Sequence, residues 1–291
     1  MLPTLIITGI ITGAIYALLG LGLVVIYRTS QIVNFAQGDM ATAMTFVAFS
    51  LLTQFHIPYL VSFITVLGMA FVFGLLVERA IIRPVSGSGT MVAVGITLGF
   101  SLVLNGVSSR IWGTQVMNFP APTEATAANI LGVTISGTEM IILGVTAACV
   151  LALFAFFRYT RIGIAMRATS EDRDAARLMG INVGSITGLS WGMAGLLGAM
   201  AGMLISPMLT LTPNQLDLLV IRAFAAVVIG GFTSMPGAVL GGLLIGVAES
   251  LTEGYVPVAM TNTLMFFIIM LVLVFRPNGL LGRHEVRRSM I

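Results

Sequence analysis

The residues that could carry chemistry in this chain are few, and their types exclude most enzyme mechanisms. Among its 291 residues there are 2 histidines and one cysteine, and every basic residue is an arginine. A metal site or a hydrolase triad needs clustered His, Cys or carboxylate side chains, and the sequence contains no such motif. A P-loop needs a lysine on the phosphates of ATP. We therefore expect no catalytic residue, no metal, no cofactor and no ATP site in this chain.

The longest polar stretch runs from Arg158 to Asn182 and holds five of the 14 basic residues. Within it, Thr169 or Ser170 could cap a helix, acidic residues follow in the first turn, and Gly180 could end it. Ala175, Leu178 and Met179 share one face and form a small apolar patch. We predict a short amphipathic helix in an aqueous loop. A solvated loop helix with no further role is the alternative.

A second polar stretch interrupts the apolar N-terminal region at 34–39, which reads NFAQGD. Irregular backbone at membrane depth is tolerated only when it is buried in protein or lines water. Asn34, Phe35, Gln37 and Asp39 are therefore candidates for the wall of a pathway, and an ordinary solvated turn is the alternative. Asn105 and Glu249 lie inside apolar spans, where each could line the same path or bond to a neighbouring helix.

The elements that position these residues are membrane helices. The chain is 57% hydrophobic and 9% charged, with a mean hydropathy of +1.05, whereas soluble domains carry roughly 25% charged residues. Its surface must face a lipid bilayer. The net charge of +3 fits arginines beside an anionic leaflet and gives no reason to expect nucleic acid. We predict one all-α, polytopic transmembrane domain over 1–291.

A membrane-spanning helix needs about 20 apolar residues. The sequence predicts eight or nine segments, some of them short or broken, and the count depends on whether two short pieces near the C-terminus both cross. The predicted spans are 5–27, 40–54, 59–77, 90–107, 139–157, 185–206, 218–233, 237–252 and 259–275.

The arginines indicate which loops face the cytoplasm. Most of them lie in 78–89, in 158–184 and in the C-terminal tail. By the positive-inside rule these segments are cytoplasmic. The loops 108–138 and 207–217, together with the N-terminus, are then expected on the outside.

Two stretches of the chain share a weak pattern of apolar and polar segments. An apolar stretch, a polar break and a short apolar span occur in 16–54 and again in 218–252, where the second break includes Gly230 and Gly231. Broken helices at matching positions indicate a transport pathway, although Gly and Pro could merely end one helix and begin another. A stripe of glycines favours close packing within the chain over a subunit interface: Gly188, Gly192, Gly195, Gly198 and Gly202.

The polar stretch at 171–180 resembles a known motif. Asp174, Ala175 and Ala176, followed after three residues by Gly180, resemble the EAA-x3-G motif of ABC-importer permeases, with Asp in place of Glu. The resemblance implies that this helix docks into a cytoplasmic ATPase and passes its movement to the membrane helices. The implied coupling residues are Glu171, Asp172, Arg173, Asp174, Ala175, Ala176, Arg177 and Gly180.

The stretch at 34–39 resembles the NFAxG signature of the branched-chain amino acid (LivH-type) permeases. Those often have His and Glu where this chain has Gln37 and Asp39. Further similar stretches follow in the same order along nearly the whole chain: Arg167-Ala168 before Glu171-Asp172, 178–182, 225–231 and 276–280.

This resemblance implies a permease subunit of an ABC importer in a bacterial inner membrane, moving a branched-chain amino acid or a similar small polar or carboxylate solute. It implies four partners, namely a homologous (LivM-type) permease, two cytoplasmic ATPases that hold the ATP, and a periplasmic binding protein. A stand-alone ion-coupled carrier or channel is the alternative, for which Arg222 and Glu249 are the nearest buried charges. A third class, a membrane scaffold, needs no broken helices.

Overall fold

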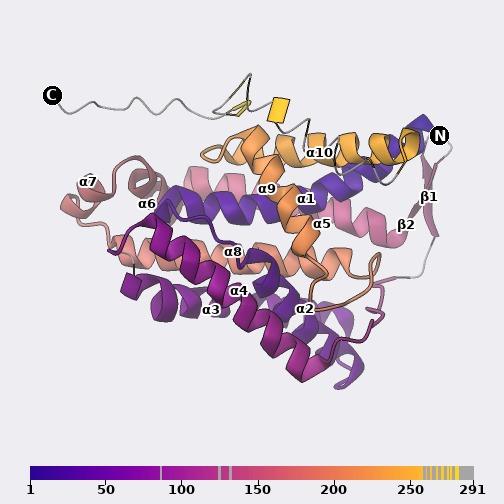
Figure 1. Ribbon diagram of the computed structural model, residues 1–291, viewed down its shortest axis with the longest axis horizontal. Helices are drawn as coiled ribbons and strands as arrows, with labels where there is room; N and C mark the ends of the chain where they lie inside the picture. The colour runs from indigo at the N-terminus through magenta and orange to yellow at the C-terminus, as the bar shows by residue number, and fades with distance from the viewer. Residues whose placement is uncertain are drawn as a thin grey trace.

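The computed structural model of the chain is built almost entirely from helices (Figure 1). It describes residues 1–85, 87–123, 126–130 and 133–257, and the positions 260, 263, 267, 270, 271, 274, 276 and 279–281; the side chains of 126–130 are not described. The predicted span 259–275 and the predicted cytoplasmic tail therefore lie largely outside the described residues.

Six of the described helices are long and apolar enough to cross a membrane. They coincide with predicted spans and confirm an all-α membrane bundle. The helix that ends at Val77 is continued by a π-helical turn, Glu78–Ile82, and a 3-10 turn, Arg83–Val85. The six are α1 (Leu2–Ser30), α3 (Tyr59–Val77), α4 (Thr90–Trp112), α5 (Gly137–Tyr159), α8 (Val183–Ile205) and α10 (Met235–Tyr255).

Two further helices are shorter. Helix α2 (Gln37–Thr53) has 17 residues and α9 (Asp217–Gly230) has 14. At 1.5 Å per residue they rise only about 26 and 21 Å, less than the hydrocarbon core of about 30 Å. Each adjoins a predicted break, since 31–36 separates α1 from α2 and 231–234 separates α9 from α10.

The two ends of the bundle differ. One end carries α6 (Arg161–Glu171) and α7 (Arg173–Leu178), and the N-terminus lies at the other (Figure 1). Near the N-terminus lies an antiparallel hairpin of β1 (Thr126–Ile130) and β2 (Val133–Ser136), which the prediction of a plain loop missed. Met117 pairs with Leu211 by two backbone hydrogen bonds, so the predicted outer loops lie on the same side.

Helices α1 and α8 form the interior of the bundle. In the most apolar 18-residue stretch of each helix, 89% of the residues are buried in α1 and 83% in α8. The corresponding shares are 11% in α4 and 17% in α5. The peripheral helices thus present apolar side chains outward, as a surface in contact with lipid requires.

Glycines allow the interior helices to approach closely. A Cβ on Gly13 of α1 would lie 2.8 Å from the backbone of Gly242 in α10, and one on Gly195 of α8 would lie 2.5 Å from the carbonyl oxygen of Ala70 in α3. The predicted stripe on α8 therefore packs within the chain, against α2, α3 and the turn after α3. Small residues at such crossings let backbones meet.

Candidate functional site

The first break, between α1 and α2, is built from buried polar side chains. Asn34 and Gln37 are 1% and 0% exposed. Nδ2 of Asn34 donates to Oε1 of Gln37 over 3.2 Å, and Nε2 of Gln37 donates to the carbonyl oxygen of Ala194 over 2.8 Å. Because Ala194 lies midway along α8, these bonds hold the start of α2 at the middle of the bundle. The break is therefore not a solvated turn.

Carboxylate and amide groups converge beside this break. The hydroxyl of Ser101 donates to the Asp39 carboxylate, with which the side chain of Asn105 also interacts. Nδ2 of Asn105 donates to Oδ1 of Asn214 over 2.9 Å. The structure thus brings together Asp39 and Asn105, which were predicted separately as pathway residues. It adds Ser101, which sequence reasoning missed although it lies four residues before Asn105 and so on the same helix face.

The second break is built from backbone. A Cβ on Gly230 would lie 2.0 Å from the carbonyl oxygen of Gly237, so the backbones meet directly. Gly231 ends α9 with φ +102°, a conformation that favours glycine. The N–H groups of Leu280 and Leu281 donate to the carbonyl oxygens of Ile229 and Gly230 over 2.7 and 3.1 Å. These bonds satisfy carbonyls that the end of α9 leaves free.

Aromatic rings connect the two breaks. Phe35, which is 41% exposed, stacks on Phe224 of α9 with ring centroids 6.1 Å apart. Phe224 meets Phe232 of the second break at 5.2 Å, and Phe232 meets Tyr27 of α1 at 5.0 Å. Two segments far apart in the sequence thus share one contact cluster. Nothing in the sequence pattern indicated that these rings meet.

Two charged residues of neighbouring helices pair with each other inside the bundle. Arg222 of α9 forms an ion pair with Glu249 of α10, which is 3% exposed. The hydroxyl of Tyr16 in α1 donates to Oε2 of Glu249 over 2.6 Å and accepts from Nη1 of Arg222 over 3.2 Å. The alternative that Glu249 bonds to a neighbouring helix is therefore the one the structure supports. This triad ties α9 and α10 to α1.

The polar stretch after α5 forms two helices, and the predicted cap is wrong. Thr169 and Ser170 lie in the last turn of α6. The cap of α7 is Asp172, whose Oδ1 accepts from the N–H groups of Asp174 and Ala175, each over 2.9 Å. An Asp carboxylate caps a helix at least as well as a Ser or Thr hydroxyl, and its negative charge also interacts favourably with the helix dipole. Glu171 accordingly ends α6 and does not belong to α7.

Gly180 ends the short helix as predicted, in a Schellman turn. Its φ is +81°. Its N–H donates to the carbonyl oxygen of Arg177, and the N–H of Ile181 donates to that of Ala176, both over 3.0 Å. The turn leaves Leu178 and Met179 89% and 82% exposed. Two large apolar side chains thus stand in solvent at the tip of the α6–α7 segment.

The two alanines of the predicted coupling motif lie in different surroundings. Ala175 is exposed, whereas Ala176 is buried within this chain. Asp174 forms an exposed ion pair with Arg177 over 3.0 Å. Arg173 and Arg177 both line a cavity on the inner side of α7. The exposed residues of α7 and its C-cap that do not line this cavity are Asp174, Ala175, Leu178 and Met179.

Comparison with known proteins places this geometry in a family. A family model described as branched-chain amino acid transport system / permease component matches residues 5–275. The LivH permease protein of the high-affinity branched-chain amino acid transport system of Salmonella typhimurium is 30% identical, over 96% of this chain and 95% of its own length. A probable LivH permease of Methanocaldococcus jannaschii is 32% identical, over 94% and 90%.

A third relative is the BraD permease protein of Pseudomonas aeruginosa, 30% identical over 97% of this chain and 96% of its own length. These proteins are named as permeases of transport systems and not as enzymes. The chain belongs to the family of branched-chain amino acid transport permeases.

Proposed function

We propose that this chain is a membrane-spanning permease subunit of an ABC importer, moving a branched-chain amino acid or a similar small carboxylate solute across the inner membrane. Its partners would be a homologous (LivM-type) permease, two cytoplasmic ATPases that bind ATP, and a periplasmic binding protein. The observation that carries the coupling role is the exposed pair Leu178 and Met179 beside a glycine-ended turn. Large apolar side chains in water at one point indicate a partner surface.

In the proposed topology the single domain 1–291 has eight or nine membrane segments, of which α2 and α9 are short. The end that carries α6 and α7 faces the cytoplasm, because most arginines lie there. The N-terminus and the β1–β2 hairpin face outward. The segment 158–184 would be the coupling loop.

The proposed pathway follows the two breaks. Its walls would be the predicted residues, Asn34, Phe35, Gln37, Asp39, Asn105, Gly230 and Gly231. Several of these are buried, so the proposed path would be closed in this conformation and would open by alternating access. Phe35 is the exposed member, and its ring is the part of the first break that a solute would meet.

The stand-alone carrier is less well supported. An ion-coupled carrier needs buried groups that exchange charge during transport. Arg222 and Glu249 are bound to each other and to Tyr16, so their geometry suits a structural role.

The coupling proposal is tested by Leu178→Glu and Met179→Glu in the assembled transporter. Both side chains are exposed, so the fold should persist, while the apolar contact with the ATPase is lost. We expect each change to weaken ATPase retention by about tenfold, the effect of about 1.4 kcal/mol at an interface anchor. ATP-driven uptake into proteoliposomes should fall accordingly.

Val116→Glu is the matched control, because Val116 is 63% exposed and precedes Met117, which pairs with Leu211 beyond the far end of α8. It should keep wild-type uptake and ATPase retention. Wild-type uptake in the Leu178→Glu, Met179→Glu double variant would overturn the role of α7. Uptake that needs no ATPase at all would favour the stand-alone carrier.

A further inference from the structure

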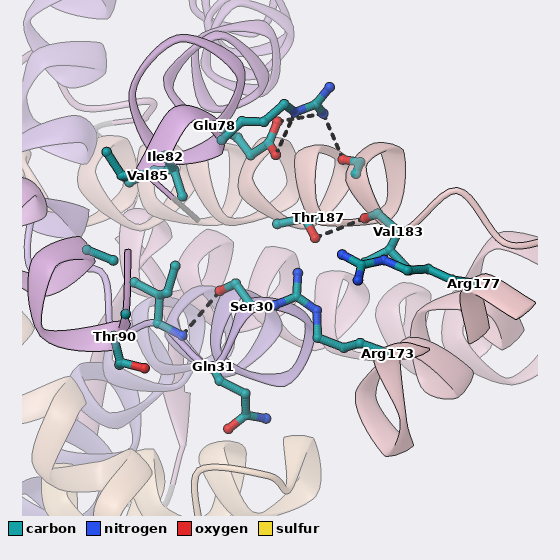
Figure 2. A pocket seen from close by; sticks show the side chains of 15 residues that line it. Ser30, Gln31, Glu78, Ile82, Val85, Thr90, Arg173, Arg177, Val183 and Thr187 are labelled. Carbon is teal, nitrogen blue, oxygen red and sulfur yellow. Dashed lines mark hydrogen bonds and ion pairs between the residues drawn. The ribbon is translucent and has the colours of Figure 1, made fainter. Parts of the chain in front are cut away.

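A cavity of about 380 Å³ lies beneath α7, between this helix and the membrane helices. Its walls come from the end of α1, the π-helical turn, the segment before α4, α7 and the first turn of α8. Figure 2 shows the side chains of Arg173 and Arg177 reaching from α7 toward the end of α1 and the start of α8. The space is within the range of small-ligand sites, about 300–1,000 Å³.

The charges that line this cavity do not balance. Three arginines and one carboxylate face it. The carboxylate, Glu78, is occupied by Arg83 through two hydrogen bonds of 3.2 and 2.9 Å, and Arg83 also donates to the carbonyl oxygen of Gly184. Arg173 and Arg177 are therefore left as an excess of positive charge on the lining.

Neither arginine is neutralised inside the cavity. Arg177 pairs with Asp174, but that carboxylate is 87% exposed and is not part of the lining. Nε of Arg173 is buried and has no hydrogen-bond partner among the described residues. The pKa of Arg173 is lowered from its usual value, first by burial and then by the charge of Arg177. Two cations facing one partly buried space repel each other.

Two of the three hydroxyl groups on the lining are already in use. Oγ of Ser30 donates to the carbonyl oxygen of Ile26, and Oγ1 of Thr187 donates to that of Val183. Beside the Thr90 hydroxyl and the Gln31 side-chain amide, the side-chain donors that remain on the lining are guanidinium N–H groups, and only these carry a positive charge. A guanidinium matches the two oxygens of a carboxylate or phosphate, and such charge-assisted bonds are the stronger kind.

We propose that this cavity binds a compact oxyanion, a carboxylate or phosphate group, held between Arg173 and Arg177. Two sources share this chemistry, a free anion in the aqueous phase and the headgroup of an anionic lipid. The bound anion would join α7 to the ends of α1 and α8. The wall includes Ile32, two residues before Asn34, so occupancy would couple the position of α7 to the first break.

That last consequence rests on the proposed function of α7 as the coupling helix, whereas the binding itself does not. Binding is measured on the purified full-length chain without an ATPase, in nanodiscs of phosphatidylcholine. Inorganic phosphate is titrated against chloride at constant ionic strength, and the thermal midpoint of unfolding is recorded. A second set of nanodiscs contains phosphatidylglycerol in place of part of the phosphatidylcholine.

We expect a saturable rise of the midpoint with phosphate, or a rise in the phosphatidylglycerol nanodiscs. Arg177→Gln and Arg173→Gln should each weaken the response by about tenfold or more, as the loss of a hydrogen bond to a charged group predicts. Arg177→Lys should lose less, because it keeps the charge. Arg161→Gln, an exposed arginine of α6 outside the lining, is the matched control and should respond as wild type.

The phosphate titration and the phosphatidylglycerol nanodiscs together identify the source of the bound oxyanion. A response to phosphate alone supports a free anion, and a response to phosphatidylglycerol alone supports a lipid headgroup. No response in either arm, or a wild-type response in Arg177→Gln, would overturn the proposal. The side chain of Arg177 is 61% exposed, so this variant should fold even if Arg173→Gln does not. If an arginine variant lost oxyanion binding but kept ATPase coupling, the proposed function of the chain would be unaffected.

Discussion

The two breaks occupy similar places in the sequence pattern, but different forces hold them. At the first, the side chains of Asn34 and Gln37 bond to each other and to the backbone of α8. At the second, the backbones of Gly230 and Gly237 touch directly. A side-chain hydrogen bond contributes about 1 kcal/mol net and can exchange partners, whereas two backbones that leave no space for a Cβ between them have little room to slide.

This difference indicates different roles for the regions around the two breaks. We infer that the corner between α9 and α10 is a fixed support, further tied to α1 by Arg222, Glu249 and Tyr16. We infer that the start of α2 is the part suited to move, because its bonds to other helices are made by side chains. The aromatic contacts through Phe224 and Phe232 connect the two breaks, and on this inference they would transmit a change at one break to the other.

The largest effect on stability is expected at the buried ion pair between Arg222 and Glu249, beside the second break. Glu249→Leu leaves Arg222 in an apolar surrounding without its partner. Breaking a buried pair in this way costs about 3–5 kcal/mol, so the thermal midpoint in detergent and the yield of monodisperse protein should both fall sharply.

The double replacement Arg222→Met, Glu249→Leu removes both charges and should recover much of that loss. Equal midpoints for Glu249→Leu and wild type would show that the pair does not support the second half. In that case the contrast between a fixed and a mobile break would rest on the glycine contacts alone.

A smaller loss is expected from Gly230→Ala. The added Cβ would lie 2.0 Å from the carbonyl oxygen of Gly237, and overpacking of this kind costs about 1–3 kcal/mol. Gly144→Ala in α5 is the matched control, because a Cβ there has nothing within 4 Å. If the two variants had the same thermal midpoint, the second break would be looser than the structure indicates.

The sequence predicted the elements better than their contacts. Apolar length located the long helices, and Gly180 marked its turn, because both are local properties of the chain. Local rules also erred where two caps were equally good, as with Asp172 in place of Thr169 or Ser170. The partners of Glu249 and Phe35 lie far away along the chain, and a periodic pattern carries no information about which helix a side chain will face.

The smallest effect on stability, and the sharpest test of the comparison, is expected at the first break. Gln37→Leu removes the bonds to Asn34 and Ala194, which should cost about 1–2 kcal/mol because buried polar partners are left without a bond. If this break is the mobile half, uptake should change far more than the thermal midpoint. Gln37→His keeps a side-chain donor at this position, and it should retain most of the uptake. A loss of stability in Gln37→Leu as large as that in Glu249→Leu would mean that both breaks are fixed supports, and α2 would then have to move as part of a larger rigid unit.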